Sequence, residues 1–128
     1  MKRLGLINAQ LLSAVGALRH TDRFGIGDSG LPVPVGVPVI DLAIVYGLPA
    51  FEPVYSAVVS EVVLQNAWIA EESLSTASGL LELLKRDAPV QTVSHGELKS
   101  MLESCKFVVR TGSVTPYTNA ILEAGVAW

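Results

Sequence analysis

The chain is 128 residues long, which is the length of one ordinary domain. Nine lysine and arginine residues against twelve aspartate and glutamate residues give a net charge of −3, which argues against nucleic acid or a membrane surface as a partner. Hydrophobic residues make up 50% and charged residues only 16%, whereas a typical soluble domain carries about 25% charged residues. A surface so short of charge predicts partner subunits, and we expect a homo-oligomer.

The single cysteine, Cys105, excludes an intramolecular disulfide and a cysteine-rich metal site, and it suits a reducing compartment. The longest apolar stretches fall short of the roughly 18 residues that a membrane span needs. The start of the chain looks superficially like a signal peptide, but Asn8 and Gln10 interrupt its apolar region. We therefore expect a cytoplasmic protein without a transmembrane helix.

Three kinds of segment are predicted in the first part of the chain. Apolar residues recur at helical spacing up to Leu18, behind Asn8 as an N-cap, and predict a first helix. A short strand over 24–27 precedes the segment 28–38, whose three prolines and two glycines indicate a rigid loop. The nearly continuous apolar run 39–46 is typical of a strand covered on both faces.

The middle of the chain is less clear. The segment 54–70 is ambiguous by periodicity, and its β-branched valines favour strand, with 68–70 as a second piece. Leucines on one face, glutamates near the start and Lys85 at the end predict a second helix over 73–85.

The last part of the chain alternates between strands and a helix. Residues 90–93 and 106–110 are predicted strands. Between them, Ser94 and Glu97 have the capping-box spacing that opens a third helix through Glu103. This alternation predicts an α/β fold, and we expect one domain over residues 1–128, a three-layer α/β/α sandwich on a mostly parallel mixed sheet.

The common catalytic motifs for nucleotide, zinc and serine-hydrolase chemistry are absent, and no metal site is expected. His20 and His95 are the side chains whose ordinary pKa lies near neutrality, so a general acid or base most simply comes from them. A histidine just after a helix is also often only a C-terminal cap, and this is the alternative for His20.

Several polar or aromatic residues could contact a ligand. Asp28 follows a strand and opens a loop, where open α/β sheets collect binding groups, although an Asx-turn is the commoner explanation. Tyr117 and Asn119 follow Pro116 and bring hydroxyl and amide groups that suit a polyhydroxylated ligand, with an ordinary turn as the alternative. Trp128 could stack on a sugar or pack against a neighbouring subunit.

Six pieces of the chain, each weak alone, form a specific pattern in their order. They are Gly5 to Leu12, His20-Thr21-Asp22, Asp28-Ser29-Gly30-Leu31-Pro32-Val33-Pro34, Ile69-Ala70-Glu71-Glu72, His95, and the tail from Arg110-Thr111-Gly112 through Pro116-Tyr117-Thr118-Asn119 to Gly125-Val126. Together they resemble the D-ribose pyranase and L-fucose mutarotase family over nearly the whole chain. The second and third pieces resemble the ribose branch more than the fucose branch.

The resemblance implies an isomerase that interconverts the pyranose and furanose forms of D-ribose, or of a related monosaccharide, by acid–base ring opening and reclosure. It implies no cofactor, because no electrons or phosphoryl groups move. It implies His20 as the proton donor, and sugar contacts from Asp28, His95, Tyr117 and Asn119. It also implies rings of subunits, stacked into a decamer-like assembly, with sites near the interfaces.

Three alternatives stay open beside this interpretation. The first is a non-catalytic monosaccharide-binding or regulatory module that uses the same pocket. The second is a structural oligomer with a vestigial pocket, and the third is a fucose-type mutarotase.

Overall fold

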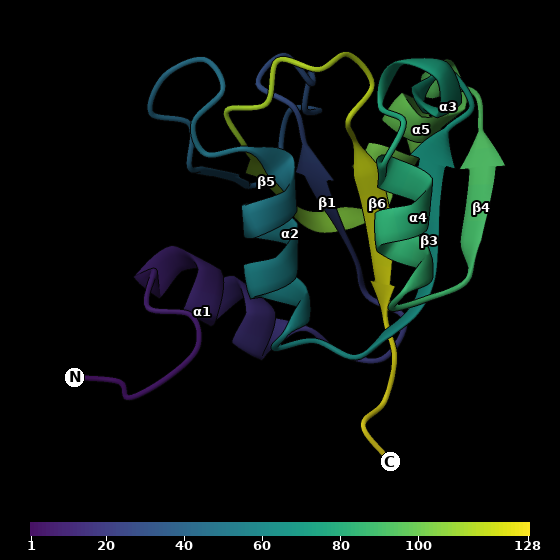
Figure 1. The fold of residues 1–128 in the computed structure, drawn as a ribbon. Helices are drawn as coiled ribbons and strands as arrows, with labels where there is room; N and C mark the ends of the chain where they lie inside the picture. Colours follow the sequence, from purple (N-terminus) through teal and green to yellow (C-terminus); the bar gives the residue numbers. More distant parts are fainter.

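The computed structural model describes all residues from Met1 to Trp128 (Figure 1). The helices are α1 (Ala9–Ala17), α2 (Phe51–Val59), α3 (Ser73–Thr76), α4 (Leu80–Lys85), α5 (His95–Met101) and the 3-10 helix η1 (Leu102–Ser104). The strands are β1 (Arg23–Gly27), β2 (Val39–Asp41), β3 (Leu64–Ala70), β4 (Val90–Val93), β5 (Cys105–Arg110) and β6 (Ala120–Ala124).

The six strands form one sheet in the order β2-β5-β1-β6-β3-β4. Strand β6 is antiparallel to both of its neighbours, and the other strands run parallel to one another. Figure 1 shows the consequence: β1, β3 and β4 point to one edge of the sheet, and β6 points to the opposite edge. The predicted mostly parallel mixed sheet is confirmed.

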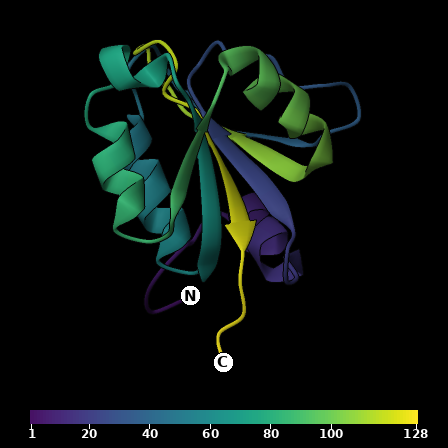
Figure 2. The same cartoon turned by 90° about the vertical axis from the view of Figure 1, so that its right-hand side faces the viewer.

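Helices cover both faces of the sheet (Figure 2). On one face, Leu11 of α1, Val58 of α2 and Leu84 of α4 belong to the same buried cluster as the strand residues that face them. On the other face, Leu98 and Leu102 pack against a second buried cluster. The three-layer α/β/α sandwich is therefore confirmed. None of the helices combines the length and the apolar character needed to cross a membrane.

Most of the predicted elements are present. The side chain of Asn8 accepts a hydrogen bond from the backbone of Leu11 and caps α1, as predicted. The hydroxyl of Ser94 accepts one from the backbone of Glu97 and begins α5, which η1 extends to Ser104. The segment 28–38 holds no helix or strand, which confirms the predicted loop.

The prediction of a strand from Val54 onward is wrong, because this segment begins inside α2. The buried residues of α2 are Phe51, Val54, Tyr55 and Val58, a spacing of three and four that places them on one helical face. Packing of that face against the sheet outweighs the β-branched composition. The strand that follows, β3, begins only at Leu64.

Two further elements are shorter than predicted. Strand β2 ends at Asp41 because its partner β5 ends at Arg110, directly opposite, and the carboxylate of Asp41 then closes a turn on the backbone of Ala43. The apolar residues Ile44, Val45 and Tyr46 are exposed in the loop that follows. The predicted helix over 73–85 is broken into α3 and α4, because Ser78 and Gly79 between them are poor helix formers.

Candidate functional site

The predicted site residues lie at two opposite edges of the sheet. Asp28 directly follows β1, His95 opens α5 after a single residue that separates it from β4, and Asn119 directly precedes the antiparallel β6, so these three share the edge where the parallel strands end. Tyr117 lies in the same segment as Asn119. His20 precedes β1 and lies at the other edge. With five residues at about 3.3 Å each, β1 alone separates the two edges by about 16 Å.

Asp28 and Asn119 form a two-point pair at the first edge. The Oδ1 atom of Asn119 accepts the backbone N–H of Asp28 at 2.8 Å, and its Nδ2 atom donates to Oδ2 of Asp28 at 3.1 Å. Gly27 permits this approach, since a Cβ atom there would lie only 2.8 Å from the Asn119 oxygen. The other carboxylate oxygen of Asp28 accepts the backbone N–H of Gly30, so the Asx-turn is present, and a binding role for Asp28 stays a prediction.

His95 and Tyr117 form a second pair at the same edge. Their rings meet edge to face with centroids 4.9 Å apart. The backbone N–H of His95 donates to Oε2 of Glu72 at 2.9 Å, which ties the start of α5 to the start of α3. Tyr117 has a φ of 63°, a left-handed conformation that is uncommon for a side chain of its size and that clusters at ligand sites.

Two polar atoms of this edge are buried without a hydrogen-bond partner in the chain, Nδ1 of His95 and Oγ1 of Thr118. Buried polar atoms are nearly always paired, so such atoms indicate a missing partner. A sugar hydroxyl can both donate and accept a hydrogen bond, and it therefore fits an imidazole nitrogen and a hydroxyl equally well.

The loops around Asp28 are held by a residue that the sequence analysis did not assign to the site. Arg110, at the end of β5, donates from Nε to the carbonyl of Ser29 and from Nη1 to Oδ2 of Asp41, each at 2.9 Å. The hydroxyl of Thr111 donates to the carbonyl of Gly27 at 2.8 Å. These bonds fix the segment that carries Asp28 before any ligand arrives.

His20 lies in a tight turn between α1 and β1. The backbone N–H of Asp22 donates to the carbonyl of Arg19, and Thr21 between them has a left-handed φ of 68°. The guanidinium of Arg19 donates to the last carbonyls of α1, so Arg19 and not His20 caps the helix. The alternative of His20 as a helix cap is therefore wrong.

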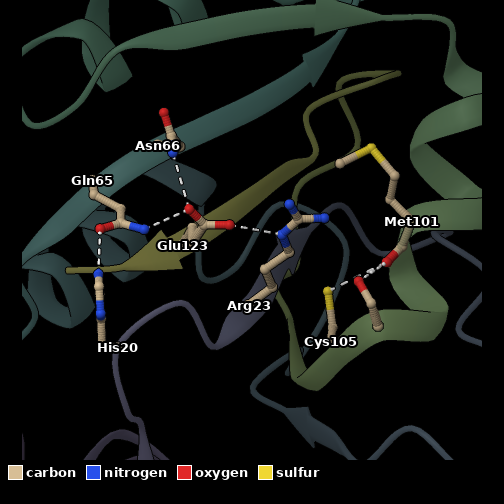
Figure 3. A network of polar contacts seen from close by, with 8 residues as sticks. His20, Arg23, Gln65, Asn66, Met101, Cys105 and Glu123 are labelled. Atoms are coloured by element: carbon tan, nitrogen blue, oxygen red, sulfur yellow. Dashed lines mark hydrogen bonds and ion pairs between the residues drawn. The ribbon is translucent and has the colours of Figure 1, made fainter.

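The imidazole of His20 instead joins a polar network across three strands (Figure 3). Its Nε2 atom lies 3.0 Å from Oε1 of Gln65, and Nε2 of Gln65 donates to Glu123 at 2.7 Å. Glu123 also accepts from Asn66 and from Nε of Arg23, each at 2.9 Å. Burial by itself would raise the pKa of Glu123, but these hydrogen bonds and the charge of Arg23 together lower it below its ordinary value.

The partners of His20 were not predicted from the sequence. Gln65 belongs to no motif, and nothing in the sequence marks it. Glu123 does carry a signal: it is an acid inside the otherwise apolar run of β6, and acids are almost never buried unless paired. Glu72 and Arg110 belong to the pieces quoted for the family resemblance, although no role was given to them.

A groove of about 560 Å³ opens beside His20 and is lined further by Glu61, Val63, Val126 and Trp128. Another groove, of about 850 Å³, lies between α1 and the β2–β5 side of the sheet and contains none of the predicted site residues. Its lining is mostly apolar, which suits a protein surface better than a sugar. The candidate site is therefore placed at the predicted polar residues and not at the larger groove.

The fold is that of an α/β protein whose paired polar residues lie at the carboxyl edge of the sheet, the edge where proteins of this class bind ligands. Residues 1–127 match the RbsD / FucU transport protein family, and the chain belongs to this family. The resemblance stated from the sequence is thereby confirmed.

Two relatives are similar over their full length. The D-ribose pyranase of Cutibacterium acnes is 48% identical over 128 residues, with 98% of each chain covered. The D-ribose pyranase of Corynebacterium glutamicum strain R is 45% identical over 128 residues, with 100% of each chain covered.

Solved structures agree with this placement. The structure of Bacillus subtilis RbsD complexed with D-ribose is 37% identical, covers 100% of both chains and has a TM-score of 0.94. The fucose mutarotase of Streptococcus pneumoniae, in complex with L-fucose, is 16% identical, covers 100% of both chains and has a TM-score of 0.78. The second similarity shows the shared fold only.

Proposed function

We propose that this protein is a D-ribose pyranase, an isomerase that interconverts the pyranose and furanose forms of D-ribose. The observation that carries the proposal is the full-length similarity, at 48% and 45% identity, to two proteins of that name. The fucose-type alternative has less support, because the fucose mutarotase is only 16% identical.

The reaction needs only proton transfers. The acid gives a proton to the ring oxygen, the ring C–O bond breaks with its electron pair staying on that oxygen, and a base removes the proton of the anomeric hydroxyl as the carbonyl forms. Reclosure reverses these transfers on a different hydroxyl, so no electrons or phosphoryl groups leave the sugar. A histidine is the side chain best suited to this task near neutral pH, and we assign the acid to His20.

The carboxyl edge is assigned to the sugar hydroxyls. Asp28 and Asn119 are held in a fixed geometry by their two hydrogen bonds. His95 offers a buried ring nitrogen that has no partner in the chain, and its contact with Tyr117 fixes both rings. In this proposal all four residues bind the sugar, which needs no cofactor and no metal ion.

One chain does not bring the acid and the binding edge together, because His20 lies beyond the far end of β1 from Asp28. A pentose is much shorter than that strand. We therefore propose that each site forms between two subunits, with His20 from one and the binding edge from the next. Rings of subunits, stacked into a decamer-like assembly, provide such interfaces at every step.

A cytoplasmic location completes the proposal. Cys105 is a free, buried cysteine, and burial raises the pKa of its thiol to about 12 despite the nearby charge of Arg23. Such a thiol is inert and fits a compartment that maintains reduced cysteines.

The test is magnetisation-exchange NMR on D-ribose, which follows transfer between the pyranose and furanose anomeric signals. The wild-type protein should accelerate this exchange, and His20→Ala should reduce the acceleration by about a hundredfold or more while light scattering shows an unchanged assembly. A wild-type rate in His20→Ala would remove His20 from the role of acid.

The same samples separate the alternatives. Calorimetric binding of ribose without any faster exchange would favour the non-catalytic binding module. Acceleration with L-fucose but not with D-ribose would favour the fucose-type mutarotase. A protein that neither binds ribose nor accelerates its exchange would favour the structural oligomer with a vestigial pocket.

A further inference from the structure

We propose that Gln65 and Glu123 are positioning residues that fix the orientation and the proton arrangement of His20, so that Nδ1 is the atom that exchanges a proton with the sugar. The proposal rests on the assignment of His20 as the acid of the ring-opening reaction. It adds two residues that lie behind the acid, and it names the nitrogen that acts.

The side chain of Glu123 is held in place by residues of both neighbouring strands. Strand pairing places Glu123 of β6 directly opposite Arg23 of β1 on one side and Asn66 of β3 on the other. Both neighbours donate to its carboxylate, and the guanidinium of Arg23 also lies 4.4 Å from the ring centroid of Trp68. With its pKa lowered, Glu123 is ionised at neutral pH and fixed in place on both sides.

Strand β3 contains a bulge at Gln65. Successive side chains of a regular strand point to opposite faces, so Gln65 and Asn66 should not both reach Glu123. The register shifts between Leu64 and Asn66, which leaves Gln65 as an extra residue opposite Glu123. Bulges redirect side chains in this way, and here both amides donate to the same oxygen, Oε1 of Glu123.

The donors and acceptors of this network determine which nitrogen of His20 carries a hydrogen. An ionised carboxylate can only accept hydrogen bonds, so Gln65 must turn its amide nitrogen toward Glu123 and its amide oxygen toward His20. That oxygen can only accept, and Nε2 of His20 must therefore carry a hydrogen in both charge states. The atom that gains and loses a proton is then Nδ1 (Figure 3).

The arrangement gives the reaction a defined acid. His20 is exposed toward the groove that Trp128 and Val126 line, so its free nitrogen is accessible to a sugar. When protonated His20 gives the Nδ1 proton to the ring oxygen, the bond to Gln65 stays intact. No ring rotation is then needed between turnovers. Outer partners that orient metal-bound histidines change activity about 10- to 100-fold, and we expect an effect of that size here.

The direct test reads the proton arrangement by long-range ¹H–¹⁵N NMR of histidine-labelled protein without sugar. The chain has only two histidines, and His20→Ala identifies the signals of His20. The wild-type protein should show one neutral form, with Nε2 protonated and Nδ1 bare. Gln65→Met, which keeps the length but removes the acceptor, should show a mixture of both forms.

The kinetic test uses ribose exchange. Gln65→Met should lower kcat about 10- to 100-fold with little change in KM, because the sugar-binding edge is untouched. Gln91→Met is the matched control: Gln91 is an exposed residue of β4, and its change should alter neither kcat nor the His20 spectrum.

A double variant provides rescue. Gln65→Glu alone places two carboxylates in contact and should be strongly impaired. Adding Glu123→Gln places an amide donor opposite the carboxylate that Gln65→Glu introduces. That carboxylate can then accept hydrogen bonds from both His20 and the new amide. The double variant should exceed Gln65→Glu in kcat by about tenfold, the typical effect of restoring such an outer partner.

Two outcomes would overturn the proposal: a wild-type His20 with Nδ1 protonated in its neutral form, or a Gln65→Met protein with wild-type kcat. A failure of the proposed function looks different. In that case the NMR shows the expected single form of His20, but neither the wild type nor any variant accelerates ribose exchange. His20 is then not a catalytic acid, and its orientation serves no catalytic role.

Discussion

At the scale of single residues, the site separates two kinds of task. Asp28 and Asn119 satisfy each other's hydrogen bonds and are rigid before a ligand binds, which is typical of groups that recognise a substrate. His20 instead contacts the chain through one ring nitrogen and leaves the other free. The sequence offers all three as candidates, because polar groups placed where strands end or begin are a local signal, and their roles stay predictions. It could not predict Gln65, whose role depends on a bulge that only strand pairing creates.

We therefore predict a binding defect for Asn119→Ala. The substitution removes both hydrogen bonds to Asp28, and a lost bond to a charged group costs about 1.5–3 kcal/mol. KM for D-ribose should rise about tenfold or more while kcat changes less, measured by NMR exchange over a range of ribose concentrations. Asn8→Ala is the control, because it loses a helix cap that contributes about 1 kcal/mol to stability, without touching the site. An equal rise of KM in both variants would assign the effect to stability alone.

At the scale of elements, the sequence succeeded where local chemistry decides and failed where packing decides. The Asn8 and Ser94 caps predicted two helix starts, because a capping side chain bonds within its own turn. The valines of α2 were misleading, because burial of one helical face against the sheet outweighs their strand propensity. The loop after β2 shows the same limit, since its apolar residues continue past the point where β5 offers a partner.

The lowered pKa of Glu123 predicts that the stability of the fold depends on pH. Because this pKa is lowered in the folded protein, the ionised form of Glu123 stabilises the fold above the unfolded value of about 4.3. That contribution is lost as pH falls through the lower folded value. Glu123→Gln should therefore be less stable than wild type at neutral pH, and the difference should shrink with increasing acidity.

The measurement is urea unfolding at fixed protein concentration over a series of pH values, because assembly couples stability to concentration. The exposed Glu103 provides the control, and Glu103→Gln should differ little from wild type at any pH. A stability difference for Glu123→Gln that is constant from neutral to acidic pH would contradict the role of its ionisation.

At the scale of the whole molecule, the single chain is incomplete in two respects. Its surface carries large apolar residues that nothing covers, including Ile44, Tyr46 and Trp128, the last of them 97% exposed. His20, the proposed acid, and the proposed binding edge lie at opposite ends of β1. A second copy would resolve both, because it would bury apolar surface and bring a second edge to each His20. Composition predicted the first of these features, but the separation of the two edges becomes visible only when β1 is placed between them.

Mixing two variants with complementary defects tests whether one site needs two subunits. His20→Ala lacks the acid and Asn119→Ala lacks part of the binding edge, so each pure assembly should accelerate ribose exchange poorly at ribose concentrations well below the wild-type KM. When both chains are co-expressed and assemble at random, about a quarter of the interfaces should pair an intact His20 with an intact binding edge. Exchange should then recover to about a quarter of the wild-type rate. Sites built within one chain would show no recovery at any mixing ratio, because every chain would still carry one defect.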